Sequence, residues 1–257
     1  MVYQAVTYQK TANIGIIYIS GHPGDRVKMI QLADELAELC SKIAWDEETR
    51  VIILTGEGEK SFSMGMDSIG AVSRNNEEQE INFLSVAEPV AKLDQPVIAA
   101  INGDAIGQGL ELALACDIRI VSETSRFGLP YIKTGFIPWD GGTQRLTRLV
   151  GRDKALEMIL TGERIDAQEA YRIDLVNKVV SHRELMTVVM DMGREIASKG
   201  PMALRYAKEA IHKGMDLNLE QGLRLEADLY FLLQTTKDRT EGVNAFREKR
   251  APKFEGK

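Results

Sequence analysis

Short hydrophobic runs alternate with helical patterns through the first half of the chain. The runs are rich in β-branched residues, which favours buried strands, and they cover residues 14–20, 51–55, 96–101 and 118–121. Between them, the chain has helical character over residues 27–45, 82–93 and 110–116. Strands that alternate with helices predict a parallel sheet whose connections are right-handed crossovers.

The last third of the chain has a different pattern. From about residue 141, almost every segment has helical periodicity, over 141–150, 153–161, 167–173, 184–198, 201–215 and 218–234. One short strand is expected at 176–180, and the polar segment 67–80 predicts a mobile loop. The sequence therefore predicts an α/β core followed by a helical segment.

The charge balance and the composition exclude several classes of function. The chain carries 38 acidic and 32 basic residues, a net charge of −6, which argues against binding nucleic acid by neutralising phosphates. Its two cysteines and three scattered histidines leave no room for a disulfide framework or a Cys-x-x-Cys zinc site, so no metal is expected. No apolar run reaches the roughly 18 residues of a membrane span. The first ten residues lack the apolar centre of a signal peptide, so we expect a cytoplasmic protein.

Two glycine-containing turns are the first candidates for chemistry. The segment 61–67 (SFSMGMD) follows the strand at 51–55, and the segment 102–111 (NGDAIGQGLE) follows the strand at 96–101. Glycine at the carboxyl end of a strand allows a ligand to approach backbone N–H groups closely. Two such turns can each offer one N–H group to a single oxygen, which is an oxyanion hole. Two ordinary tight turns would have the same spacing.

Several long blocks, in order, resemble the crotonase superfamily (enoyl-CoA hydratase/isomerase). The blocks are VIILTGEGEKSFSMGMD, QPVIAAINGDAIGQGLELALACDIRI, FGLPYIKTGFIPWDGGTQRLTRLVG, ALEMILTGERIDAQEAYRIDLVNKVV and EGVNAFREKRAPKF. The resemblance implies an α/β fold with a ββα spiral core over residues 1–195 and a C-terminal helical trimerisation region over 196–257. It also implies a homotrimer or dimer of trimers, an acyl-CoA substrate, and no cofactor, because coenzyme A is part of the substrate.

The resemblance assigns both halves of the oxyanion hole. Its two donors would be the backbone N–H groups of Met66, after Gly65, and of Gln108, after Gly107. Family members usually have glycine where this chain has Gln108. A backbone donor survives that change if Gln108 adopts the local dihedral angles, but the side chain narrows or polarises the wall of the pocket.

The proton-transfer groups match the family only in part. Family hydratases use two glutamates, and Glu111 matches the first. Glu111 lies within an apolar run, where a carboxylate is either paired in the core or catalytic. The second glutamate is replaced by Tyr131, and a phenol with a pKa near 10 is a poor general acid or base at neutral pH. Two-glutamate hydration is therefore in question.

Asp140, in the sequence WDGG, is a candidate replacement acid. This stretch is similar to the aspartate-Gly-Gly stretch of dihydroxynaphthoyl-CoA synthases and related ring-opening hydrolases, and a benzoyl-CoA dehalogenase has a nucleophilic aspartate in about the same place. Because Asp140 precedes a predicted helix, it is also a candidate helix N-cap. Trp139 either lines a pocket for a flat acyl group or fills the core.

The resemblance also implies residues that hold coenzyme A. Family members wrap the adenine and pantetheine with the segment that matches 25–29, where Arg26 or Lys28 would meet phosphates. The other matched positions are Val27, Gly65, Asp67, Gly107, Tyr230 and Lys249, and the last two would reach a neighbouring subunit's coenzyme A. A solvated charge is the alternative for Lys249.

Three functions remain open at this stage. The favoured one is hydration or dehydration of an α,β-unsaturated enoyl-CoA, open-chain or cyclic, with Glu111 as the principal acid/base and Tyr131 or Asp140 assisting. The second is enolate chemistry directed by Asp140: ring C–C hydrolysis of a β-oxoacyl-CoA, double-bond isomerisation or dehalogenation. The third is a non-catalytic relative that binds a partner.

Overall fold

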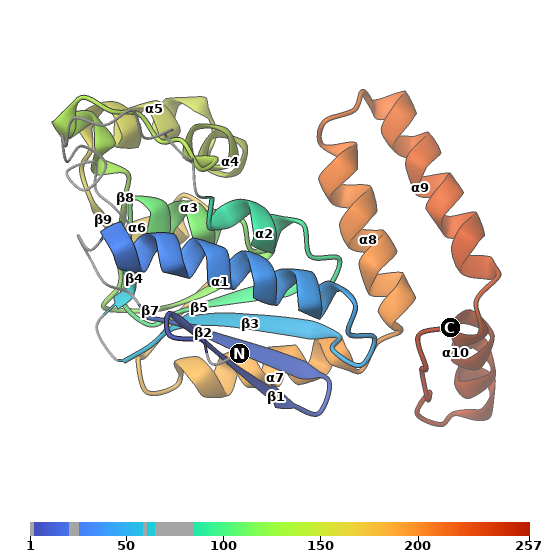
Figure 1. The fold of residues 1–257 in the computed structure, drawn as a ribbon. Coiled ribbons are helices and arrows are strands. Elements are labelled where there is room, and N and C mark those ends of the chain that lie inside the picture. The colour runs from blue at the N-terminus through green and yellow to red at the C-terminus, as the bar shows by residue number, and fades with distance from the viewer. Residues whose placement is uncertain (1–2, 21–25, 59–60, 65–84) are drawn as a thin grey trace.

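The computed structural model describes residues 3–20, 26–58, 61–64 and 85–257 (Figure 1). Within them, the main sheet has six strands in the order β1-β2-β3-β5-β7-β10. These strands are β1 (Val6–Thr11), β2 (Ile14–Ile19), β3 (Val51–Gly56), β5 (Val97–Ile101), β7 (Ile118–Ser122) and β10 (Lys178–Val180). All neighbours are parallel except β1 and β2, which form an antiparallel hairpin.

A smaller sheet carries the glycine turns. Its order within the described residues is β4-β6-β8-β9, with β4 (Ser61–Met64), β6 (Asp104–Ile106), β8 (Arg126–Gly128) and β9 (Ile165–Asp166). The first three strands are parallel and β9 pairs antiparallel with β8. The helices around the two sheets are α1 (Arg26–Ala44), α2 (Ala87–Ala91), α3 (Gln108–Leu114), the 3-10 helix η1 (Pro130–Thr134), α4 (Gly142–Val150), α5 (Arg152–Thr161), α6 (Ala167–Arg172) and α7 (Leu185–Ala197).

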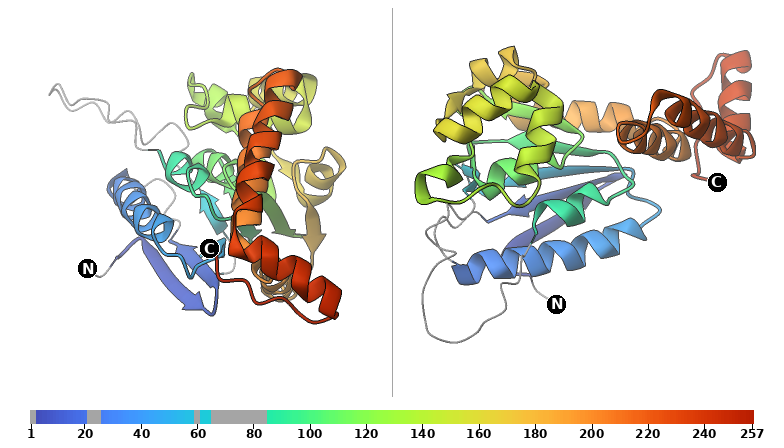
Figure 2. Two further views of the ribbon diagram at one scale, coloured as in Figure 1. Left: turned by 90° about the vertical axis from the view of Figure 1, so that its right-hand side faces the viewer. Right: turned by 90° about the horizontal axis from the view of Figure 1, so that it is seen from above.

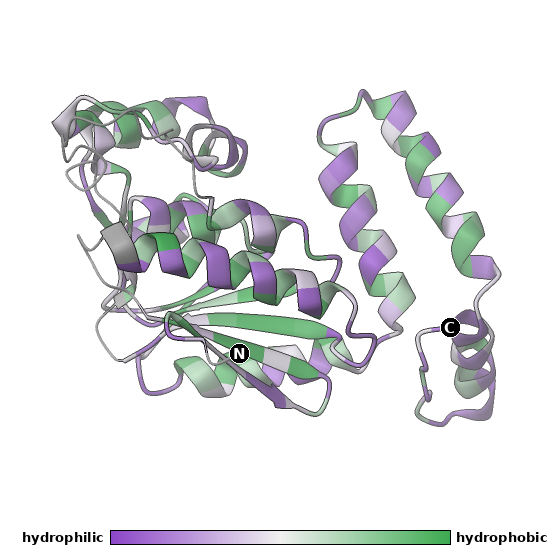
Figure 3. Ribbon diagram, viewed as in Figure 1, coloured by the Kyte–Doolittle hydropathy of each residue, from purple (hydrophilic) through white to green (hydrophobic). Residues whose placement is uncertain are grey.

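The main sheet is buried on both faces. Along β3, Ile52 and Leu54 join the large core cluster that includes α1, α2 and α3. Val51 and Ile53 point to the opposite face of the sheet and pack against α7. A strand covered on both sides favours apolar residues on both faces, which explains the hydrophobic colouring along most of β3 in Figure 3.

Three further helices extend away from the sheets (Figures 1 and 2). They are α8 (Pro201–Gly214), α9 (Leu219–Gln234) and α10 (Lys237–Glu248). Helix α8 is fixed to the core through Lys208, whose ammonium lies 2.8 Å from an Asp117 carboxylate oxygen and donates to the Gln95 carbonyl at 2.9 Å. The division of the chain near residue 195 stays a prediction.

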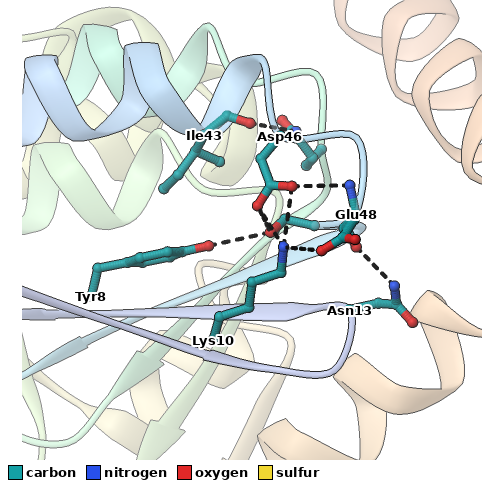
Figure 4. Close-up of polar contacts among 8 residues, drawn as sticks. Tyr8, Lys10, Asn13, Ile43, Asp46 and Glu48 are labelled. Atoms are coloured by element: carbon teal, nitrogen blue, oxygen red, sulfur yellow. Dashed lines mark hydrogen bonds and ion pairs between the residues drawn. The ribbon is translucent and has the colours of Figure 1, made fainter.

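Figure 4 shows how the edge hairpin is attached to the turn between α1 and β3. The Lys10 ammonium lies 2.8 Å from a carboxylate oxygen of Asp46 and 3.0 Å from one of Glu48. The Asn13 side-chain amide donates to the Glu48 carbonyl at 2.8 Å. These charged and polar groups pair with one another and fix the edge of the sheet, so the cluster has a structural role.

The predicted elements are largely present, and the missed ones are short or exposed. The strands β1, β4, β6, β8 and β9 and the helix α10 were not predicted, because two to six residues or a mostly exposed face give little hydrophobic periodicity. The four predicted strands β2, β3, β5 and β7 are parallel neighbours as expected, and the antiparallel pairs involve the unpredicted strands β1 and β9. Helix α2 is shorter than the predicted 82–93, of which 82–84 lie outside the described residues, as does the predicted loop 67–80.

The described residues contain neither a helix suited to cross a membrane nor a cluster of metal ligands. None of their helices combines the length and apolar character that a membrane crossing requires. In the same part of the chain, no group of three or more His, Cys, Asp or Glu side chains is placed to hold a metal ion.

Candidate active site

The two glycine turns begin side by side. Strands β4 and β6 are parallel neighbours, and Met64, the last residue of β4, pairs with Ile106, the last residue of β6. Gly107 has φ 59° and ψ −127°, a backbone conformation open almost only to glycine. Its N–H group donates to the Gly128 carbonyl at 2.9 Å, which fixes the turn. Three predicted residues of the other turn, Gly65, Met66 and Asp67, lie outside the described residues.

Helix α3 begins in direct contact with β4. A Cβ atom at Gly109 would lie 1.8 Å from the Ser63 carbonyl oxygen, so only glycine permits this approach. The contact sets the distance between the start of α3 and the end of β4. Sequence reasoning treated Gly109 only as part of the glycine-containing segment 102–111 and missed this requirement.

Gln108 is the first residue of α3 and is buried. Backbone N–H groups in the first turn of a helix point out of its end, where they favour negative charge. The Gln108 side chain turns toward the segment before α4, where its amide nitrogen donates to Asp140 Oδ2 at 3.2 Å. Sequence reasoning expected only that this side chain would narrow or polarise the pocket wall, because the partner is 32 positions away.

Glu111 lies one turn further along α3 and is completely buried. Its Oε1 accepts from the backbone N–H groups of Asp140 and Gly142, both at 2.8 Å. A Cβ atom at Gly142 would lie 2.8 Å from the same oxygen, so a glycine there allows the backbone to reach the carboxylate. Desolvation by burial raises the pKa of Glu111 to about 6. This value suits a group that exchanges protons near neutral pH.

Tyr131 contacts the other oxygen of the same carboxylate. It lies on η1, is buried, and its hydroxyl donates to Glu111 Oε2 at 2.5 Å. This hydrogen bond lowers the pKa of Glu111 and opposes the effect of burial. The position therefore holds a hydrogen-bond donor to Glu111, where the resemblance implied a second carboxylate.

Asp140 points toward the start of α2. Its Oδ2 accepts from the backbone N–H groups of Val86 at 2.9 Å and Ala87 at 3.1 Å. Its Oδ1 accepts from the Ser85 hydroxyl. A carboxylate at a helix N-terminus is stabilised by the unpaired N–H groups and by the helix dipole. The N-cap role considered for Asp140 at the following helix was wrong, because Gly141 is the N-cap of α4 and no side chain caps it. The Asp140 carboxylate meets the start of α2 instead, and Ser85 was not identified because nothing in the sequence relates it to Asp140.

The other predicted residues lie on several different elements. Trp139 is half-buried and packs against the large core cluster. Lys28 is exposed near the start of α1, and the side chains of Arg26 and Val27 lie outside the described part of the structure. Tyr230 on α9 and Lys249 at the end of α10 are exposed, and both helices lie away from α3 (Figure 2). One chain therefore does not bring Tyr230 and Lys249 to Glu111.

Comparison with known proteins identifies the family. A family model described as enoyl-CoA hydratase/isomerase matches residues 29–257. The crotonyl-CoA hydratase of Syntrophomonas wolfei is 36% identical, with 99% of each chain covered. The (E)-benzylidenesuccinyl-CoA hydratase of Thauera aromatica is 40% identical, covering 86% of this chain and 88% of the relative.

A solved structure confirms the predicted α/β crotonase fold. The crystal structure of an enoyl-CoA hydratase from Bacillus anthracis superposes with a TM-score of 0.89 at 40% identity, covering 99% of this chain and 100% of that one. Sequence and fold therefore lead to one assignment. The chain belongs to the enoyl-CoA hydratase/isomerase family.

Proposed function

We propose that this enzyme adds water across the 2,3 double bond of an enoyl-CoA thioester with Glu111 as its principal acid/base group. Enoyl-CoA hydratase activity, a lyase activity on CoA thioesters, follows from the family and from its full-length relatives. The observation that carries the assignment of the residue is the buried Glu111 carboxylate, with a pKa of about 6, one turn along α3 from Gln108.

The oxyanion hole supplies the electrostatic part of the mechanism. The thioester oxygen accepts hydrogen bonds from the amides of Met66 and Gln108, whose turns follow paired ends of β4 and β6. As water attacks Cβ, the electrons of the double bond move toward the thioester oxygen and form an enolate. Fixed N–H donors stabilise this charge without reorganising, and losing one such donor typically costs about 3 kcal/mol.

Glu111 accepts and donates the protons of the reaction. Its Oε1 is held by two backbone N–H groups, which leaves Oε2, on the Tyr131 side, to exchange protons. The carboxylate takes a proton from water as the oxygen bonds to Cβ, and it then returns a proton to Cα to give the 3-hydroxyacyl thioester. Tyr131 is favoured over Asp140 as the assisting group, since its hydroxyl contacts Glu111 directly while the Asp140 carboxylate faces α2.

The pH dependence follows from the state of Glu111. Only the ionised carboxylate accepts a proton from water, and burial raises its pKa to about 6. For hydration, kcat/KM is therefore expected to rise with pH through about 6 and to level off above it. Initial rates at low substrate concentration, measured across this range, check the prediction. A profile that is flat through pH 6 would contradict Glu111 as the base.

Removing the Tyr131 hydroxyl is expected to shift that profile. Tyr131→Phe deletes the donor that lowers the pKa of Glu111, so the acid limb of kcat/KM moves to higher pH. The rate at neutral pH falls, by roughly tenfold, because one charge-assisted hydrogen bond to the base is lost. The same pH series measures both effects. An acid limb that stays in place would show that Tyr131 does not act on Glu111.

Two alternatives receive less support. Nucleophilic or ring-opening chemistry needs an Asp140 carboxylate that faces the acyl group, but its oxygens accept from Ser85, Val86, Ala87 and Gln108. A non-catalytic role does not explain a buried Glu111 poised near neutral pH. A flat or aromatic acyl group stays within the proposal, since Trp139 is half-buried and one relative is named for benzylidenesuccinyl-CoA.

The remaining parts of the proposal concern the assembly and its setting. Helices α8 and α9 and the turn between them expose apolar side chains that a second subunit would cover, namely Ile211, Met215, Leu219, Leu223 and Phe231. A homotrimer or a dimer of trimers would bury them and bring Tyr230 and Lys249 to a neighbouring subunit's coenzyme A. Family members typically need no cofactor, and we extend this to the present enzyme. A cytoplasmic location stays a prediction.

Substrate comparison tests the proposed function. Crotonyl-CoA and an aromatic 2-enoyl-CoA are incubated with the enzyme, and hydration is followed by loss of the enoyl absorbance and by gain of one water in the product mass. A cyclic β-oxoacyl-CoA serves as the probe for ring hydrolysis. Hydration of an enoyl-CoA supports the proposal, whereas turnover of the β-oxoacyl-CoA alone would assign the chemistry to the second function.

A further inference from the structure

Asp140 connects the two halves of the active site through different atoms. Its backbone N–H donates to Glu111 Oε1 at 2.8 Å, and its side chain accepts from the Gln108 side-chain amide at 3.2 Å. Gln108 and Glu111 are both buried on α3, Gln108 at its start and Glu111 one turn later. One residue thus contacts the proton-transfer group and the residue whose amide is assigned to the oxyanion hole.

The Asp140 carboxylate is itself held firmly. It is buried, and three donors from the start of α2 surround it: the Ser85 hydroxyl and the amides of Val86 and Ala87. The Ser85 oxygen in turn accepts from the Glu88 amide at 2.8 Å, which orients the hydroxyl. A carboxylate anchored on a helix N-terminus is a rigid point of attachment for the Gln108 side chain.

The attachment fixes the first residue of α3. The Gln108 side chain extends from the start of α3 to the Asp140 carboxylate. With the end of that side chain bonded to Asp140, the side chain and backbone of Gln108 are fixed together. Gly107 fixes the preceding turn at a positive φ angle.

We propose that Asp140 is a positioning residue that, through the Gln108 side chain, sets the oxyanion amide of residue 108 in register with the Glu111 carboxylate. The proposal rests on the proposed function, because it assumes that a thioester oxygen binds at this amide. It assigns Asp140 neither nucleophilic attack nor proton transfer. Misplacing one catalytic group by about 1 Å can cost roughly 100-fold in rate, so the link matters for turnover.

Conservative and truncating variants separate positioning from chemistry. Asp140→Ala is expected to lower kcat for enoyl-CoA hydration about 10- to 100-fold. Asp140→Asn keeps an oxygen for the amides and places an NH2 group against the Ser85 oxygen, which can accept a second hydrogen bond, so it should recover most of the loss. An Asn variant as slow as the Ala variant would overturn the proposal, because it would mean that the carboxylate itself reacts.

A double-mutant cycle tests the route through Gln108. Gln108→Ala is expected to lower kcat as Asp140→Ala does, and the double variant should be little slower than the slower single variant, because both remove the same link. If the fold-losses in kcat of the two single variants multiply in the double variant, the proposal is overturned. Gln95→Ala is the matched control: it truncates another buried glutamine, whose amide donates to the Ile43 carbonyl at 3.0 Å, and it should leave kcat unchanged.

A spectroscopic readout makes the test independent of turnover and of folding yield. Butyryl-CoA is saturated and cannot be hydrated, and hydrogen bonds in the oxyanion hole lower the stretching frequency of its thioester carbonyl. Asp140→Ala and Gln108→Ala should each reduce this shift, with no further reduction in the double variant, while Gln95→Ala keeps it. A wild-type shift that neither variant changes overturns the positioning role alone. The proposed function fails separately if the wild type does not hydrate an enoyl-CoA. If the carbonyl frequency of butyryl-CoA does not shift on binding to the wild type, both the proposed function and the positioning role are overturned.

Discussion

Replacing Glu111 by glutamine is expected to lower kcat for hydration by about 10³- to 10⁴-fold, the upper part of the range for losing a general acid or base. The Glu111 carboxylate contacts both Tyr131 and the backbone N–H of Asp140, and no second glutamate stands at position 131 to replace it. Glutamine has the same shape and keeps an oxygen for the amides of Asp140 and Gly142. The loss therefore reports on chemistry, and steady-state kinetics with an enoyl-CoA measures it.

The same substitution is expected to change stability in a pH-dependent way. Burial raises the Glu111 pKa from 4.5 to about 6, so the native state holds a proton that the unfolded state has lost between these two values. Ionising the buried group above pH 6 costs about 2 kcal/mol of unfolding free energy. Glu111→Gln avoids this cost. Its stability relative to the wild type should be higher at pH 8 than at pH 5, as measured by urea denaturation.

Glu35→Gln provides a matched control for Glu111→Gln. Glu35 also accepts hydrogen bonds from backbone amides, those of Gln4, Ala5 and Val6, but it does so on α1 at the edge of the sheet. Its replacement should leave kcat unchanged. A Glu111→Gln enzyme that keeps its rate would contradict the proposed mechanism.

Substituting alanine for Gly109 is expected to damage both activity and folding. The added Cβ would lie 1.8 Å from the Ser63 carbonyl oxygen, so α3 and β4 must separate. Overpacking usually costs about 1–3 kcal/mol and occasionally more, and a backbone neighbour that cannot rotate away places this site at the upper end. Because the separation displaces one oxyanion donor from the other, kcat should fall by about 10²- to 10³-fold.

Gly214→Ala is the control for this prediction. Gly214 ends α8, and a Cβ there would meet no neighbouring atom within 4 Å. Alanine is favoured over glycine in helices by roughly 0.5–1 kcal/mol, so this variant should be as stable as the wild type or slightly more so, with unchanged kcat. Urea midpoints and steady-state rates compare the two variants. Normal rates and stability in Gly109→Ala would show that the contact with β4 is not required.

The sequence predicts the buried elements well because they carry repeated apolar positions. Strand β3 and helix α1 bury one residue after another at a clear period. The glycine turns were identified from their places after strands, and the structure pairs Met64 with Ile106 at their start. Strand β1 was not predicted, because it lies at the edge of the sheet and its exposed polar side chains interrupt the apolar pattern.

The sequence alone does not predict the polar contacts of the site. The attachment of Asp140 to the start of α2 and to Gln108 joins residues 32 to 55 positions apart, and no periodic pattern encodes such contacts. The family resemblance supplied Glu111 but placed a glutamate where Tyr131 stands. The structure is needed to show that the tyrosine hydroxyl donates to the Glu111 carboxylate.

A crystal structure of the enzyme with a saturated acyl-CoA tests the central claim most directly. The account predicts that the thioester oxygen lies about 2.7–3.1 Å from the amide nitrogens of both Met66 and Gln108, with Cβ of the acyl chain facing Glu111 Oε2. A thioester oxygen that contacts neither amide, or an acyl chain that lies away from Glu111, would contradict it.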